Sequence, residues 1–152
     1  EFPVFNASID WDVQEVVYHK PHNIAVAVKT QQGVMAPVIA NVQEKDVGEI
    51  AKDLQVLKQE AQSGGISPEK MRGATVTLSN FGTEGGVFAT PILNTPQSLI
   101  LGLARVQKKP VVQGDNIVIG NVLNLSWSFD HCLIDGDLIA AFSATFKKHL
   151  LP

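Results

Sequence analysis

Residues 122–136 read Val-Leu-Asn-Leu-Ser-Trp-Ser-Phe-Asp-His-Cys-Leu-Ile-Asp-Gly, and more than any other stretch they decide the fold. The first half alternates, with Leu125, Trp127 and Phe129 on one face and polar side chains on the other, which predicts a half-buried strand. An amphipathic helix is expected next, because apolar positions recur at helical spacing at Leu138, Ala141, Phe142, Thr145 and Phe146. A histidine and an aspartate thus lie at a strand-to-helix junction, where rigid elements can direct an ionisable side chain into a cleft.

The segments before this junction predict further strands and another helix. Strands are expected over residues 24–29, 34–40, 74–79 and 98–106, with Pro37 marking an edge or a bulge in the second of them. A helix should begin at Asp46, because Glu49 follows at capping-box spacing, and should end at Gly64-Gly65. Residues 111–119 predict a hairpin. The sum is a mixed α/β domain with some antiparallel pairing.

Length and composition suit a single globular domain. The chain has 152 residues, of which 45% are hydrophobic and 18% charged. Its net charge of −3 argues against a nucleic-acid-binding surface. No apolar run approaches the length of a membrane span, and no signal peptide is expected. The single cysteine excludes an internal disulfide framework and suits a reducing compartment.

Two motifs that resemble ligand sites have simpler structural interpretations. The glycine-rich segment from Gly82 to Gly86 matches neither phosphate-binding glycine motif, and Glu84 would repel a phosphate, so a tight turn is expected there. His19 and His22 have no cluster of cysteines or carboxylates beside them. Because zinc normally needs three or four protein ligands, no metal site is expected at this pair.

The residues around the strand-to-helix junction also allow more than one interpretation. Cys132 could be a nucleophile, but a buried packing cysteine is the preferred interpretation. His131, taken alone, is as compatible with a satisfied histidine at a strand end as with a general base. Asp135, taken alone, could cap the following helix without any chemistry.

Five sets of residues, in order along almost the whole chain, resemble the motifs of one enzyme family. His131 to Gly136 fits the H-x-x-x-D-G motif of coenzyme-A-dependent acyltransferases. The others are Pro3–Ser8, the paired segments His22–Val28 and Met35–Ile39, the T-x-S-N-x-G loop at Thr77–Gly82, and the T-P-I-x-N-x-P-[EQ] segment within Ala89–Gln97. The chain therefore resembles the catalytic core of the dihydrolipoamide acyltransferases, the central components of 2-oxo acid dehydrogenase complexes.

This resemblance implies a chloramphenicol-acetyltransferase-like fold of the α/β (α+β) class, with a mixed sheet and flanking helices. It implies acyl transfer between dihydrolipoamide and coenzyme A. His131 would be the general base that removes the proton of the attacking thiol, and the Ser79 hydroxyl would donate a hydrogen bond to the tetrahedral oxyanion. Asp135 would hold the local geometry. Coenzyme A would enter as a substrate, lipoate would be carried on a separate domain, and no metal would be needed.

The resemblance also implies partners. Members of the family are homotrimers with active sites at subunit interfaces, where one subunit supplies the histidine and its neighbour the serine, and trimers often build larger hollow cores. Lipoyl domains, a decarboxylase and a dihydrolipoamide dehydrogenase would be the other components, and neither nucleic acid nor a membrane is an expected partner. The expected location is the bacterial cytoplasm, with the mitochondrial matrix as the alternative.

Two departures from the family pattern are visible. Cys132 directly follows the histidine, where the family usually has arginine, so a salt-bridging or helix-bracing role is lost or moved. Residues 1–152 are expected to form one catalytic domain that lacks the N-terminal part of the family core, the lipoyl domain and the peripheral-subunit-binding domain.

Acyl specificity is weakly encoded. Residues 94–96 and 111–124 are slightly more similar to branched-chain members, so a branched-chain acyl group is expected, with the acetyl group of a pyruvate dehydrogenase complex as the alternative. Two other functions stay open. The chain could be an antibiotic-type acetyltransferase acting on a hydroxyl acceptor, or a non-catalytic oligomeric scaffold on which other enzymes dock.

Overall fold

A six-stranded mixed sheet forms the centre of the fold. Its strands are β3 (Ile24–Thr30), β4 (Gly33–Met35), β5 (Val38–Ile39), β6 (Val76–Asn80), β7 (Leu99–Leu103) and β10 (Leu125–Phe129). In the computed structural model, which describes residues 1–150, the order is β10-β7-β6-β3-β4, and β5 also pairs with β3. β6 is parallel to both β3 and β7, whereas β10, β4 and β5 pair antiparallel with their neighbours. The buried strand β7 thus lies between β6, which carries Ser79, and β10, which leads into the turn with His131.

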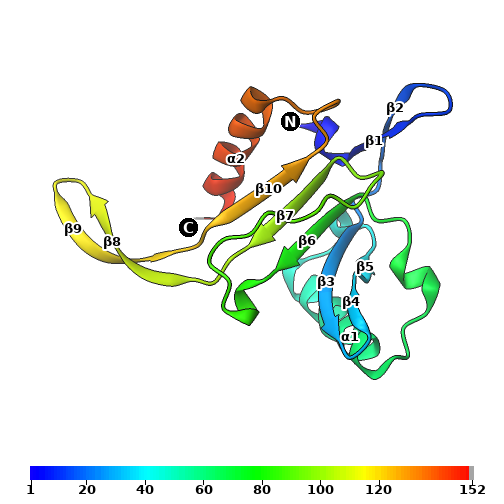
Figure 1. Cartoon of the computed structure of the whole chain (residues 1–152), viewed down its shortest axis with the longest axis horizontal. Coiled ribbons are helices and arrows are strands. Elements are labelled where there is room, and N and C mark those ends of the chain that lie inside the picture. The colour runs from blue at the N-terminus through cyan, green and yellow to red at the C-terminus, as the bar shows by residue number, and fades with distance from the viewer. Residues whose placement is uncertain (151–152) are drawn as a thin grey trace.

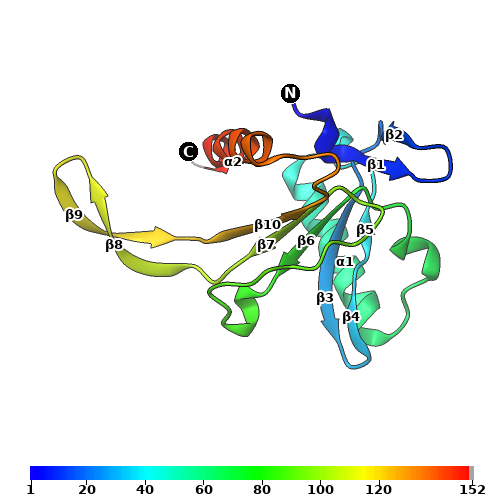
Figure 2. The ribbon, with the colours of Figure 1, turned by 45° about the horizontal axis from the view of Figure 1, so that its top comes forward.

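Two α-helices accompany the sheet (Figure 1). α1 (Val47–Ser63) begins at a capping box, in which Asp46 accepts the N–H of Glu49 at 2.8 Å and the Glu49 carboxylate accepts the N–H of Asp46 at 2.9 Å. It ends at Gly64, whose φ of 75° is the left-handed conformation that glycine adopts at little cost. α1 packs against β3 and β5, whereas α2 (Gly136–Leu150) lies over β10 (Figure 2).

Aromatic side chains attach α2 to the sheet and to the N-terminal segment. The Phe142 ring stacks on Phe5 with centroids 4.1 Å apart and meets the edge of Trp127 at 5.4 Å. Phe146 contacts Trp127 at 5.2 Å. The buried cluster beneath this layer contains Phe5, Leu99 and Ile134, so the turn before α2 is itself part of the core.

Two β-hairpins project from the body at opposite ends of the molecule (Figure 1). One consists of β1 (Ala7–Asp10) and β2 (Glu15–Tyr18), and the other of β8 (Gln107–Gln113) and β9 (Asn116–Val122). In the second hairpin Val112, Ile117 and Ile119 are 77%, 76% and 80% exposed. A two-stranded hairpin with an uncovered apolar surface is only marginally stable in water, so this one is suited to burial against another surface.

Short 3-10 helices complete the chain. They are η1 (Pro3–Asn6), η2 (Val42–Glu44), η3 (Pro68–Met71) and η4 (Gly82–Glu84). Within residues 1–150, neither α-helix combines the length and the hydropathy needed to cross a bilayer.

Most of the predicted elements are confirmed, including both helices, the capping box and the β8–β9 hairpin. The strand expected over residues 34–40 is instead divided into β4 and β5 around Pro37, because proline donates no ladder hydrogen bond. The run from Val122 to Phe129 is also interrupted, since residues 123–124 separate β9 from β10, and there the Asn124 side chain donates to the Val87 carbonyl at 3.0 Å. The β1–β2 hairpin was not predicted, because its strands are short and lack a glycine turn.

Candidate functional site

His131 lies at the start of a tight turn between β10 and α2. The Asp130 carbonyl accepts hydrogen bonds from the N–H groups of Leu133 at 3.1 Å and Ile134 at 2.9 Å, and Ile134 is only 1% exposed. The turn is therefore fixed at both ends. His131 itself is exposed, and its ring lies 5.7 Å from the Phe129 ring. No residue described by the structure forms a hydrogen bond with the imidazole, which leaves both ring nitrogens available to a ligand.

Asp135 is the N-cap of α2. Its carboxylate accepts the N–H of Leu138 at 2.9 Å, and its carbonyl accepts that of Ile139 at 3.1 Å. The residue thus has a direct structural function at the base of the turn. Within residues 1–150 no hydrogen bond joins the Asp135 carboxylate to the His131 ring, and the supporting role of Asp135 in catalysis stays a prediction.

Cys132 is exposed, so the expectation of a buried packing cysteine was wrong. The reason is that β10 ends at Phe129, which places Cys132 in the turn and not on a strand face. A hydrogen bond with the Asp130 carboxylate, together with its negative charge, raises the pKa of the Cys132 thiol. Because the thiolate is the nucleophilic form, a raised pKa argues against a nucleophilic role for this residue.

Ser79 lies near the C-terminal end of β6, before the glycine-rich loop. The Asn80 side chain accepts the N–H of Gly82 at 3.1 Å, and Gly85 has a φ of 87°. A side chain at Gly82 would clash with the backbone of Ala104, so the loop packs closely against the end of β7. The predicted tight turn is confirmed, and it holds the half-buried Ser79 at the edge of a rigid loop.

The sheet keeps His131 and Ser79 apart within one chain. In the strand register Ser79 is paired with Gly102, and Gly102 is paired with Ser126. Ser79 and Ser126 therefore lie two strands apart, a separation of roughly 10 Å across the sheet. Phe129 lies three residues beyond Ser126, which adds roughly 10 Å along the strand, and the turn that carries His131 begins after it. The two predicted catalytic residues therefore do not form one site in an isolated chain.

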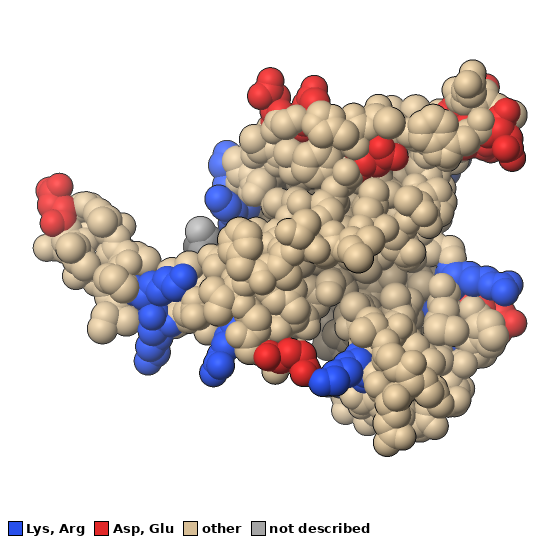
Figure 3. All heavy atoms as spheres, viewed as in Figure 1, with Lys and Arg blue, Asp and Glu red and all other residues tan. Residues whose placement is uncertain are grey.

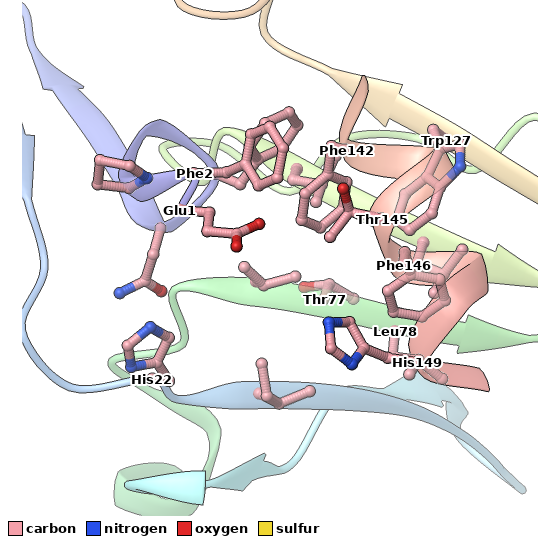
Figure 4. Close-up of a pocket in the computed structure, with 17 residues that line it drawn as sticks. Glu1, Phe2, His22, Thr77, Leu78, Trp127, Phe142, Thr145, Phe146 and His149 are labelled. Atoms are coloured by element: carbon pink, nitrogen blue, oxygen red, sulfur yellow. The ribbon is translucent and has the colours of Figure 1, made fainter. Parts of the chain in front are cut away.

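A well-defined cavity lies in a different part of the molecule. It has a volume of about 660 Å³ and lies between α2, η1 and the sheet, with Phe2, Phe142 and Phe146 among its lining residues. Figure 4 shows the rings of His22 and His149 facing this space from separate elements. Neither His131 nor Ser79 lines it, so its size alone does not mark the candidate active site.

A second cavity of about 310 Å³ contains the other histidine of the His19–His22 pair. Nε2 of His19 lies 3.0 Å from the Ser8 hydroxyl, which gives this ring an ordinary hydrogen-bond partner. Within residues 1–150, no three His, Cys, Asp or Glu side chains are grouped closely enough to hold a metal ion.

Comparison with known proteins identifies the family. The family model described as the catalytic domain of the 2-oxoacid dehydrogenases acyltransferase matches residues 1–151. An acetyltransferase component of the pyruvate dehydrogenase complex of Bacillus subtilis is 41% identical over 90% of this chain and 31% of its own length. The lipoamide acyltransferase component of the mitochondrial branched-chain alpha-keto acid dehydrogenase complex of Bos taurus is 36% identical over 99% of this chain and 31% of its own length. The chain thus spans about a third of these relatives.

Solved structures give the same result. The Azotobacter vinelandii dihydrolipoamide acetyltransferase, studied for the role of one serine, one histidine and one asparagine in its catalytic mechanism, is 34% identical with a TM-score of 0.91. The cubic core of a pyruvate dehydrogenase multienzyme complex is 35% identical, also with a TM-score of 0.91. Each match covers 94% of this chain and 59% of the other.

A chloramphenicol acetyltransferase, 16% identical with a TM-score of 0.52 over 93% of this chain and 67% of its own, shares the fold and confirms the predicted fold class. Since the family model covers nearly every residue and the relatives exceed 30% identity, the chain belongs to the family of 2-oxoacid dehydrogenase acyltransferase catalytic domains.

Proposed function

We propose that this chain transfers an acyl group between dihydrolipoamide and coenzyme A, with His131 as general base and Ser79 as oxyanion donor. One observation carries the assignment. The serine and the histidine studied in the Azotobacter enzyme are 52 residues apart, and the asparagine follows the histidine by four. Ser79, His131 and Asp135 have the same two spacings here, with aspartate in place of asparagine at the third position.

The chemistry follows from the properties of the two side chains. A ring nitrogen of His131 takes the proton of the attacking thiol, and the resulting thiolate adds to the thioester carbonyl carbon of the other carrier. The Ser79 hydroxyl donates a hydrogen bond to the oxyanion, which is worth about 3 kcal/mol of barrier. The intermediate then collapses, the original carbon–sulfur bond breaks, and the protonated imidazole returns its proton to the departing thiolate. One thioester forms as another breaks.

We propose that the site is assembled between two copies of this chain in a homotrimer. The separation of His131 from Ser79 within one chain supports this, because both side chains are needed at one carbonyl group. The exposed apolar surface of the β8–β9 hairpin supports it too.

Charge favours a head-to-tail arrangement. Acidic side chains gather over the β1–β2 hairpin and basic ones at the base of the β8–β9 hairpin (Figure 3), where the residues are Asp10, Asp12 and Glu15 on one side and Lys108 and Lys109 on the other. Two different surfaces of this kind make a head-to-tail interface, which forms a closed ring when the rotation between neighbouring subunits closes, as it does in a trimer. A larger core built from trimers, as in the cubic core of a relative, is part of the same proposal.

The finer assignments are proposals as well. The lipoyl group would arrive on a separate domain, and the decarboxylase and dihydrolipoamide dehydrogenase would be the other partners. Relatives from acetyl and branched-chain complexes have similar identities of 41% and 36%, so a branched-chain preference is supported only by residues 94–96 and 111–124. We place the protein in the bacterial cytoplasm on the same basis of family resemblance.

Replacing the histidine tests the proposal. In the full-length protein, His131→Ala should lower the rate of acyl transfer by roughly 10²–10⁴-fold, the usual contribution of a general base. His149→Ala is the matched control, since it removes an exposed histidine near the end of α2. The assay would use dihydrolipoamide with acetyl- and isobutyryl-coenzyme A, and a mass measurement would show that each variant assembles. Wild-type turnover by His131→Ala would refute the assignment.

A further inference from the structure

The turn that carries His131 is organised by one neighbouring residue, Asp130. Its N–H donates to the Ser98 carbonyl at 2.9 Å, which ties it to the start of β7. Its carbonyl accepts the N–H groups of Leu133 and Ile134, and its carboxylate accepts the N–H of Cys132 at 2.9 Å. Asp130 therefore makes hydrogen bonds to Ser98, at the start of the neighbouring strand β7, and to the three residues that follow His131.

We infer that Asp130 is a positioning residue that fixes the direction of the His131 imidazole; this inference relies on the proposed function of His131. The histidine ring has no hydrogen bond of its own within residues 1–150, so its direction depends on the backbone that carries it and on its contact with the Phe129 ring. Asp130 holds that backbone. Asp130 directly follows β10, and an aspartate at the start of a turn commonly accepts a hydrogen bond from the backbone N–H two residues ahead.

The contacts of Asp130 distinguish a positioning role from that of a charge partner to the His131 imidazole. In a serine protease triad, the aspartate binds the imidazole directly. Here the Asp130 carboxylate instead faces the Cys132 side of the turn, where it bonds the Cys132 amide and raises the pKa of the Cys132 thiol. Its contribution to His131 is therefore geometric. An amide oxygen in place of the carboxylate oxygen should serve equally well, because it can accept the same N–H group.

Two substitutions in the full-length protein test this difference. Asp130→Ala removes the acceptor and should lower kcat by roughly 10–100-fold with little change in KM, as expected when a catalytic group is misplaced by about 1 Å. Asp130→Asn keeps the acceptor and should retain kcat within about threefold. Asp137→Asn, in the first turn of α2, is the control for loss of a nearby charge. Wild-type kcat in Asp130→Ala would overturn the inference, as would equal losses in both Asp130 variants.

A structural measurement decides the inference independently of activity. Crystal structures of both variants should show the His131 ring against Phe129 in Asp130→Asn and displaced from it in Asp130→Ala. An unmoved ring in Asp130→Ala would overturn the positioning role even if activity fell. If His131→Ala proved fully active, the proposed function would fail, whereas the position of the ring in the two Asp130 variants would still decide what Asp130 does. Should Asp130→Ala not fold, the ring position and kcat of Asp130→Asn distinguish geometry from charge.

Discussion

Subunits that carry Ser79→Ala and subunits that carry His131→Ala should each be inactive alone and active when they assemble together. The separation of the two residues in the sheet, two strands across and more than three residues along, keeps Ser79 and His131 of one chain from acting on the same carbonyl group. In a mixed trimer, a working site needs its histidine from a Ser79→Ala subunit and its serine from a neighbouring His131→Ala subunit. With equal amounts and random assembly each condition holds for half of the subunits, so about one quarter of the sites should be intact.

The assay is co-expression of the two variants with different affinity tags, followed by tandem purification and measurement of acyl transfer. Ser79→Ala alone should lose roughly 10²–10³-fold in kcat, so the background is far below the expected activity. A blend of the separately assembled variants is the control, because its subunits are already committed to inactive trimers. If co-assembled trimers were no more active than that blend, the shared-site reasoning would be refuted.

Three further outcomes follow from contacts within the chain. Since the Asp130 carboxylate raises the pKa of the Cys132 thiol, alkylation of Cys132 should begin at a higher pH than alkylation of a free cysteine. Asp130→Asn should shift the pH profile of Cys132 alkylation downward, and an unchanged profile would contradict this. Asp46→Ala removes the cap of α1 and should cost about 1 kcal/mol of unfolding free energy, seen as a lower urea midpoint. Ile134→Ala leaves a void beneath the His131 turn and should cost about 2–5 kcal/mol in the same experiment, so a loss below that of the cap variant would argue against a core role.

The elements of this fold were predictable where local chemistry determines them. The capping box at Asp46 and Glu49, the glycine at the end of α1 and the alternation of β10 each act over a few residues, so the sequence shows them directly. The interruption at Asn124 was not predictable, because its side chain bonds to the carbonyl of Val87, a residue distant in sequence. Pairing across the sheet is a tertiary property, and sequence spacing does not reveal it.

The candidate site likewise has a part that local sequence predicts and a part that it does not. His131, Ser79 and Asp135 could be found from motifs, since each belongs to a short pattern. The exposure of Cys132 was missed, because the strand was expected to continue through Cys132, three residues beyond the end of β10. The hydrogen bonds of Asp130 to Ser98, Leu133 and Ile134 were not predicted, since bonds through backbone groups leave little trace in residue type.

The β8–β9 hairpin has a consequence for how the protein gains its stability. In the proposed homotrimer a neighbouring subunit would cover its exposed apolar side chains, so part of the free energy that orders this segment would come from association and not from the fold of one chain. The melting temperature should therefore rise with protein concentration, and amide hydrogens along β8 and β9 should exchange faster on dilution than those of β7. Folding of the β8–β9 hairpin and association of the subunits would then be thermodynamically coupled.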